Sequence, residues 1–191
     1  HNLRNQLDVI NSHAEALDDT EHSEAILTAT DKLATLGTRA RRIDHIMSKD
    51  RQPTTVDFAK QIDAVLEGTE TADITVTTSL PDEATVVTDA EILTIVLRSP
   101  LENAVTYADS SVIISGESTD SGCTIEISDD GPGIPSAELN SLAAERETPL
   151  QHSRGLGLWE LKWGVDKLDG ELSFSTGDGT TVTIQLPDLD L

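Results

Sequence analysis

Apolar residues recur at spacings of four and three along the first fifty residues, which is the pattern of amphipathic helices. The first set is Leu3, Leu7, Ile10, Ala14 and Leu17, and the second is Ile26, Ala29, Leu33, Leu36, Ala40, Ile43 and Met47. A short polar run at 18–20 separates them, so the pattern predicts an antiparallel helical hairpin. One hairpin leaves much of its apolar seam exposed, and we therefore expect two hairpins from different subunits to form a four-helix bundle.

The pattern changes after Pro53 to short alternating runs mixed with helical ones. Residues 50–53 end the second helix and mark a boundary between domains at 1–52 and 53–191. Strands are predicted at 74–80, 86–87, 111–116, 122–129, 171–175 and 180–186, and helices around 58–66, 91–105 and 158–168. The fold class is therefore α+β, with a helical hairpin followed by helices layered on a sheet.

Two glycine-rich stretches flank a polar segment in the second half of the chain. The first, at 131–133, follows an alternating strand, and its glycines let a ligand approach the backbone closely. In the second, Gly155 and Gly157 precede a predicted helix, where free N–H groups and the positive end of the helix dipole favour phosphate. Two such loops joined by the polar segment 136–154 predict a nucleotide site with a lid.

Three local features give further expectations. Thr88 with Glu91 matches a capping box for the helix that follows. An interior proline removes one helix hydrogen bond, so Pro100 predicts a bend or broken turn just before Asn103. Trp159 and Trp163 fall opposite the apolar stripe of their helix, which predicts a contact with the bundle or a partner.

The chain is strongly acidic, and this excludes several classes of partner. It has 35 Asp and Glu against 13 Lys and Arg, a net charge of −22. Repulsion of this size argues against binding DNA, RNA or an anionic membrane. Such a surface suits a cytoplasm rich in potassium salt, and we expect stability to fall as salt is removed. No apolar run approaches the ~20 residues that span a bilayer, so membrane attachment is expected only through regions outside this chain.

The motifs ENAVTYA, DDGPGIP and RGLGLW follow one another in the order and spacing of the N box and two glycine boxes of histidine kinases, which this chain resembles. Its first residues, HNLRNQL, resemble the phosphoacceptor box of the same family. The resemblance implies a dimerising, phosphotransfer hairpin followed by an α/β two-layer sandwich of the histidine-kinase ATPase type, a fold shared with gyrase and heat-shock chaperones. RGLGLW and HNLRN are most similar to the boxes of haloarchaeal sensor kinases.

The resemblance implies roles for individual residues. Asn103 would bind the Mg²⁺ that bridges the phosphates of ATP, because its amide oxygen is a hard ligand. Asp129 would accept a hydrogen bond from the adenine amino group, and an ionised carboxylate there selects adenine over guanine. Further nucleotide contacts are implied for Tyr107, Gly131, Gly133, Ile134, Arg154, Gly155, Leu156, Gly157 and Leu158. Core packing is the alternative for Tyr107, and a solvated surface position is the alternative for Arg154.

The implied activity is that of a sensor histidine kinase core. ATP would give its γ-phosphoryl group to His1, which would pass it to an aspartate of a response regulator. Such transfer depends on alignment and charge neutralisation, so the ATP domain has to swing to bring His1 into line. Asn5 matches a position that in many relatives orients water to remove phosphate from the regulator. The implied partners are thus a receiver domain and a second copy of this chain.

Departures from the family pattern leave other functions open. Asn2 stands where an acidic residue is common, Ser99 stands where another asparagine is usual, and no phenylalanine box is recognisable. These departures would suit a nucleotide-binding pseudokinase or a phosphatase scaffold. A gyrase- or chaperone-type ATPase module is a further alternative, although the HNLRN hairpin and the absence of a glutamate at the Ser99 position speak against it.

Overall fold

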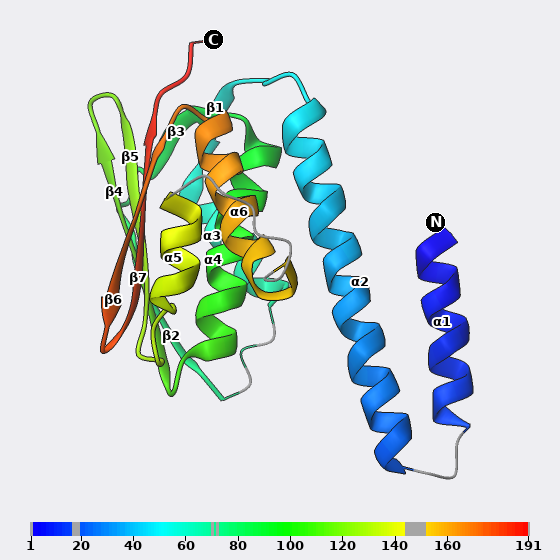
Figure 1. Cartoon of the computed structure of the whole chain (residues 1–191). Helices are drawn as coiled ribbons and strands as arrows, with labels where there is room; N and C mark the ends of the chain where they lie inside the picture. Colours follow the sequence, from blue (N-terminus) through cyan, green and yellow to red (C-terminus); the bar gives the residue numbers. More distant parts are fainter. Residues whose placement is uncertain (1, 17–19, 70, 72, 144–151, 191) are drawn as a thin grey trace.

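The computed structural model shows a long helical hairpin beside an α+β domain (Figure 1). It describes residues 2–16, 20–69, 71, 73–143 and 152–190, with the backbone alone at 2–5, 20, 143 and 152–155. The final turns of the second hairpin helix lie against the α+β domain. The order of a hairpin followed by helices on a sheet confirms the predicted fold class.

The hairpin consists of α1 (Asn2–Glu15) and α2 (Thr20–Ser48), which lie side by side. Leu7 and Ala14 of α1 are buried against α2, as the spacing predicts. Much of the apolar seam nevertheless faces solvent in the single chain, with Leu33 50% exposed and Met47 64% exposed. This exposure is what one half of a bundle would show, and the second hairpin remains a prediction.

The α+β domain contains two sheets, in which nearly all neighbouring strands are antiparallel. Its main sheet has the order β2-β4-β5-β7-β6, with β2 parallel to β4 and every other neighbouring pair antiparallel. The strands are β2 (Thr75–Ser79), β4 (Ser111–Thr119), β5 (Gly122–Asp129), β6 (Glu171–Gly177) and β7 (Gly179–Pro187). A small sheet pairs β1 (Thr54–Asp57) with β3 (Thr85–Thr88). All the predicted strands are present, and β1 is an addition that the sequence pattern did not indicate.

Helices cover one face of the main sheet (Figure 1). They are α3 (Phe58–Glu67), α4 (Ala90–Tyr107), α5 (Ser136–Ala143) and α6 (His152–Lys167). The core lies between the layers, because alternate residues of β5 such as Ile125 and Ile127 point inward toward Leu97 and Leu101 of α4. Leu158, Leu161, Val165 and Leu168 form the buried stripe of the last helix, as predicted. No helix in the described part of the chain is long and apolar enough to cross a membrane.

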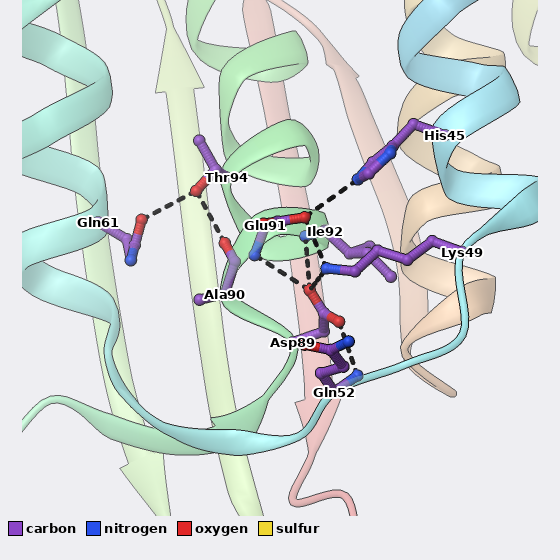
Figure 2. A network of polar contacts seen from close by, with 9 residues as sticks. All are labelled: His45, Lys49, Gln52, Gln61, Asp89, Ala90, Glu91, Ile92 and Thr94. Carbon is purple, nitrogen blue, oxygen red and sulfur yellow. Dashed lines mark hydrogen bonds and ion pairs between the residues drawn. The ribbon is translucent and has the colours of Figure 1, made fainter.

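Three local predictions need correction. The cap of α4 is Asp89 rather than Thr88, since the Asp89 carboxylate accepts the N–H groups of Glu91 and Ile92 (Figure 2). The helix continues without a break through the buried Pro100, so of the expected bend or broken turn the broken turn does not form. The helix predicted to begin after Gly157 begins at His152, which places the second glycine stretch inside it.

Two tryptophans lie on α6 outside its buried apolar stripe, as the helical spacing of the sequence predicted. Trp159 and Trp163 are both half-buried, with their ring centroids 5.3 Å apart and the rings tilted by 41°. Neither ring is fully covered within this chain. Their expected contact with the bundle or a partner stays a prediction.

Candidate functional site

A cavity of about 310 Å³ lies between α4, the ends of β5 and β7, and the loop that leads into α5. Its apolar wall includes Ile127, Ile134, Leu158, Leu161 and Val182, and its polar groups are Asn103, Tyr107, Asp129, Glu138 and Thr180. A cleft of this kind, mainly apolar with a few convergent polar groups, is the usual form of a small-molecule site. The segments 102–108 and 129–135, far apart in sequence, thus meet as the motif order predicted.

Asp129 ends β5 at the wall of this cavity. Its Oδ1 accepts the N–H of Gly131 at 3.0 Å, and Thr180 also hydrogen-bonds to the carboxylate. Burial raises the pKa of the Asp129 carboxyl, while the bonds from Gly131 and Thr180 lower it, and the balance is upward. The carboxylate therefore retains acceptor capacity in apolar surroundings, where one N–H donor of a ligand would bind strongly.

Thr180 is a site residue that the sequence did not reveal. It is opposite Asp129 in the β5–β7 ladder, and only 7% of it is exposed. Gly179 makes this approach possible, because its φ is +107° and a Cβ there would lie 2.2 Å from the Asp129 carbonyl oxygen. β7 pairs with β5 across more than fifty residues of sequence, so no local pattern could place Thr180 beside Asp129.

Asn103 lies on α4 one turn before Tyr107, and both line the cavity. Tyr107 is 57% exposed, so core packing, the alternative for this residue, is wrong. Glu138 of α5 reaches the cavity as well and was not anticipated, since an acidic residue in a polar segment gives no signal. The Asn103 amide oxygen is a hard ligand suited to Mg²⁺.

The described residues contain no group of three or more His, Cys, Asp or Glu that could hold a metal ion. Mg²⁺ usually keeps several waters and binds through one or two protein oxygens together with substrate phosphates. One amide oxygen at the cavity wall therefore fits a metal that arrives with a nucleotide better than a resident ion. The donor set is compatible with the predicted role of Asn103.

The two glycines of the first stretch have different roles. Gly133 lines the cavity at a φ of +80°, and a Cβ there would lie 2.5 Å from the Thr176 hydroxyl. Gly131 is buried and does not line the cavity. A Cβ on Gly131 would lie 2.1 Å from the carbonyl oxygen of Tyr107. Gly131 therefore lets the end of β5 meet the end of α4, whereas the bare backbone was expected to face a ligand.

Asp130 fixes the same junction by hydrogen bonds. Its Oδ1 accepts the backbone N–H groups of Asp109, Ser110 and Ser111, each at 3.0 Å. The hydroxyls of Ser110 and Ser111 donate to its Oδ2. Bonds from Ser110 and then Ser111 hold the pKa of the Asp130 carboxyl well below its usual range. The loop after α4 is thereby tied to the end of β5, so the walls that carry Asn103 and Asp129 keep a fixed separation.

The second glycine stretch lies within α6, and of its residues whose side chains the structure describes, Leu158 lines the cavity. Gly157 is buried, and a Cβ there would lie 3.1 Å from Arg39 and 3.3 Å from Ser99. Ser99 donates a 2.7 Å hydrogen bond to the Gly157 carbonyl oxygen. Glycine at this position lets α6 pack closely against α2 and α4, a packing role that the prediction of a loop did not include.

The remaining predicted residues fall into two groups. Leu156 is half-buried on α6 and does not line the cavity. Arg154 and Gly155 belong to the first turns of α6, and Asn5 belongs to α1, but their side chains lie outside the described part of the structure. His1 also lies outside the described residues.

Comparisons with curated proteins agree with this geometry. Residues 88–190 match the model of the histidine kinase-, DNA gyrase B- and HSP90-like ATPase family. The sensor protein BceS of Halalkalibacterium halodurans is 34% identical over 110 residues, covering 53% of this chain and 33% of that protein. The sensor histidine kinase RegB of Cereibacter sphaeroides is 33% identical over 90 residues, covering 41% of this chain and 20% of that protein. The chain spans a third or less of these curated relatives.

Solved structures share the fold. The Acinetobacter baumannii histidine kinase AdeS matches with a TM-score of 0.70 at 21% identity, over 100% of this chain and 98% of that one. Full-length ShkA in complex with AMPPNP matches with a TM-score of 0.72 at 17% identity, over 98% of this chain and 44% of that one. The family model covers more than half of the 191 residues. The chain therefore belongs to the histidine kinase-, DNA gyrase B- and HSP90-like ATPase family.

Proposed function

We propose that this chain is the catalytic core of a sensor histidine kinase, which binds Mg-ATP and phosphorylates His1. The observation that carries the proposal is the convergence of Asn103 and Asp129 on one apolar cavity. Family membership supports ATP as the nucleotide, and the sensor histidine kinase among the relatives supports a histidine as the phosphoryl acceptor.

The cavity suits an adenine ring between apolar walls. The ring would lie among Ile134, Leu158 and their neighbours, with its amino group donating to Asp129. Tyr107 and Gly133 would contact the base or ribose, and Gly131 would act indirectly by joining β5 to α4. Thr180 would hold the Asp129 carboxylate in the orientation that receives the amino group.

The phosphates would extend toward Asn103 and the beginning of α6. The free N–H groups of the first turn of a helix and its positive dipole end favour a phosphate. Arg154 and Gly155 belong to this first turn and would contact the phosphates there, and Leu156 and Gly157, which the resemblance also implies, follow in the next turn. Bound Mg²⁺ would neutralise the charge that develops on the phosphate oxygens during transfer.

In the proposed reaction, a ring nitrogen of His1 attacks the γ-phosphorus, the bond from that phosphorus to the bridging oxygen breaks, and ADP leaves. The phosphoryl group then passes to an aspartate of a response-regulator receiver domain. Asn5 would orient the water that later removes it from that partner. The exposed seam of the hairpin supports a homodimer, in which two seams cover each other.

The acidic surface supports a kinase that works in concentrated potassium salt inside a cell, of the kind found in haloarchaea. Nucleic acid is not a partner in this proposal. Any membrane attachment would come from other regions of a longer sensor protein.

A labelling experiment tests the proposal against its alternatives. A protein extended upstream of His1 is incubated with γ-labelled ATP, and acid-labile label on the protein is the expected result. The His1→Ala variant should lose this label, and the matched His13→Ala variant, altered at an exposed histidine of the same hairpin, should keep it. Nucleotide binding without label would indicate a scaffold, and release of free phosphate without label would indicate an ATPase.

A further inference from the structure

Glu138 lines the cavity but takes no part in the contacts proposed above for the base, the phosphates or the metal. It belongs to the first turn of α5 and is half-buried. Within the described part of the chain, no hydrogen bond or ion pair occupies its carboxylate. Asp129 and Glu138 therefore bring two carboxylates to one cavity from different elements of the fold.

The backbone around Glu138 is fixed at both ends of its turn. The N–H of Glu138 donates to the carbonyl oxygen of Pro135 at 2.9 Å, and the N–H of Ile134 donates to the hydroxyl of Thr176 on β6 at 3.1 Å. One turn further along α5, Leu142 is buried and anchors the helix. The first turn of α5 is thus attached to the main sheet on one side and to the packed interior on the other. The carboxylate is held at the cavity before a ligand arrives, which favours specific binding.

The chemistry of a carboxylate limits which part of ATP Glu138 can contact. An ionised carboxylate accepts hydrogen bonds and cannot donate them. The phosphate oxygens and ring nitrogens of ATP are acceptors as well, and its donors are the adenine amino group and the 2′- and 3′-hydroxyls of the ribose. A favourable contact with Glu138 therefore has to come from the amino group or from the sugar.

The two carboxylates of the cavity can divide these donors between them. Asp129 lies at the end of β5, where Gly131 and Thr180 orient its carboxylate, and it is the proposed acceptor for the amino group. The sugar hydroxyls then remain for Glu138. Two neighbouring hydroxyls match the two oxygens of one carboxylate, and acidic side chains bind ribose hydroxyls in dinucleotide sites by the same chemistry.

The order of groups in the nucleotide agrees with this division. A carboxylate repels phosphate, so the triphosphate has to leave the cavity away from Glu138, toward Asn103 and the first turn of α6. The ribose connects the base to the phosphates, and it therefore lies between Asp129 and Asn103 along the bound nucleotide. Glu138 is the further acidic side chain on the cavity wall at which such a sugar can be read.

We propose that Glu138 recognises the ribose of the bound nucleotide by accepting hydrogen bonds from its 2′- and 3′-hydroxyls. The protein would thereby select ribonucleotides over deoxyribonucleotides, and it would reject a sugar that carries a 2′-phosphate, since two negative groups would meet. This inference rests on the proposed function for the identity of the ligand as an adenine nucleotide. Glu138 determines specificity in this scheme and takes no part in phosphoryl transfer.

The test compares two nucleotides by calorimetry on the full chain in molar KCl with Mg²⁺. They are ADP and 2′,3′-dideoxy-ADP, which lacks both hydroxyls, and neither can donate a γ-phosphoryl group during the titration. The measured quantity is the ratio of their dissociation constants, called here the sugar ratio. Both ligands carry the same charge, so loss of one negative side chain does not change the ratio through general repulsion. The variants are Glu138→Ala and the control Glu67→Ala, which removes an exposed glutamate of α3 that does not line the cavity.

The wild type and Glu67→Ala should bind ADP about tenfold more tightly than the dideoxy nucleotide, as expected for hydrogen bonds to a charged group. In Glu138→Ala the sugar ratio should fall to about twofold or less. An equal sugar ratio in Glu138→Ala and Glu67→Ala would overturn the inference, even if Glu138→Ala melts at a lower temperature, because a purely structural role would lower stability and leave the ratio unchanged.

Two further titrations separate the sugar from the other possible contacts of Glu138. Glu138→Ala should keep the wild-type preference for ADP over inosine diphosphate, which has a carbonyl in place of the amino group; a changed preference with an unchanged sugar ratio would assign Glu138 to the base. The wild-type sugar ratio should persist in excess chelator, and its loss there would assign Glu138 to the metal. Either result would overturn the inference and leave the nucleotide site intact. Failure of the wild type to bind ADP or ATP would instead refute the proposed function itself.

Discussion

Replacing Gly131 by alanine is expected to damage nucleotide binding although Gly131 does not line the cavity. The new Cβ would lie 2.1 Å from the carbonyl oxygen of Tyr107 and 2.8 Å from its carbonyl carbon. Both are backbone atoms, so no side-chain rotation relieves the contact and β5 has to move away from α4 by about 1 Å. Forced overpacking of this kind costs about 1–3 kcal/mol.

Two measurements, of the melting temperature and of ATP affinity, test the size of this effect. At about 2 kcal/mol, the melting temperature of a domain of this size should fall by roughly 6 °C. The displacement also separates Asp129 from Asn103, and a loss of about 1.4 kcal/mol in binding would weaken ATP affinity roughly tenfold. Gly177→Ala is the matched control, because a Cβ at Gly177 meets nothing within 4 Å. If Gly131→Ala equals Gly177→Ala in melting temperature and in calorimetric ATP affinity, the assignment of Gly131 as a packing glycine is refuted.

Three further outcomes are expected. Asp129→Asn should weaken ATP binding about tenfold and narrow the preference for ATP over GTP in calorimetry, since an amide can donate as well as accept; an unchanged preference would count against adenine recognition there. Asp130→Ala should lower both melting temperature and ATP affinity, because three N–H groups lose their acceptor, whereas the exposed Asp120→Ala should change neither. The melting temperature should rise from low to molar KCl because salt screens the −22 net charge, and a flat response would contradict this.

The sequence predicted those features that depend on local pattern. Alternation of apolar and polar residues predicted β5 and β7, and helical spacing of apolar residues predicted α2 and α4. The order of the motifs indicated that Asn103 and Asp129 would lie at one site, and both line the same cavity. β1 was missed because its four residues bury only one apolar side chain, Val56, which is too short a pattern to recognise.

What the sequence could not predict depends on contacts between distant segments. The second glycine stretch was expected in a loop, since glycine is a poor helix former. In the fold, Gly157 lies inside α6 and packs closely against Arg39 of α2 and Ser99 of α4, where a Cβ would be a tight fit. Thr180 lies in the site because β7 pairs with β5, and Glu160 is buried where α6 packs beside Arg42 of α2. A glutamate between Trp159 and Leu161 has no local feature that marks it as buried.

Asp89 takes part in several interactions at once, which limits the substitutions that this position can accept. A single carboxylate begins the helix that carries Asn103 and also receives the linker at Gln52 and the ammonium group of Lys49. A substitution there would fray that helix and at the same time loosen the attachment of the hairpin. Substitutions that adjust the contact between the hairpin and the α+β domain without disturbing α4 are therefore expected at Lys49 and Glu91 rather than at Asp89.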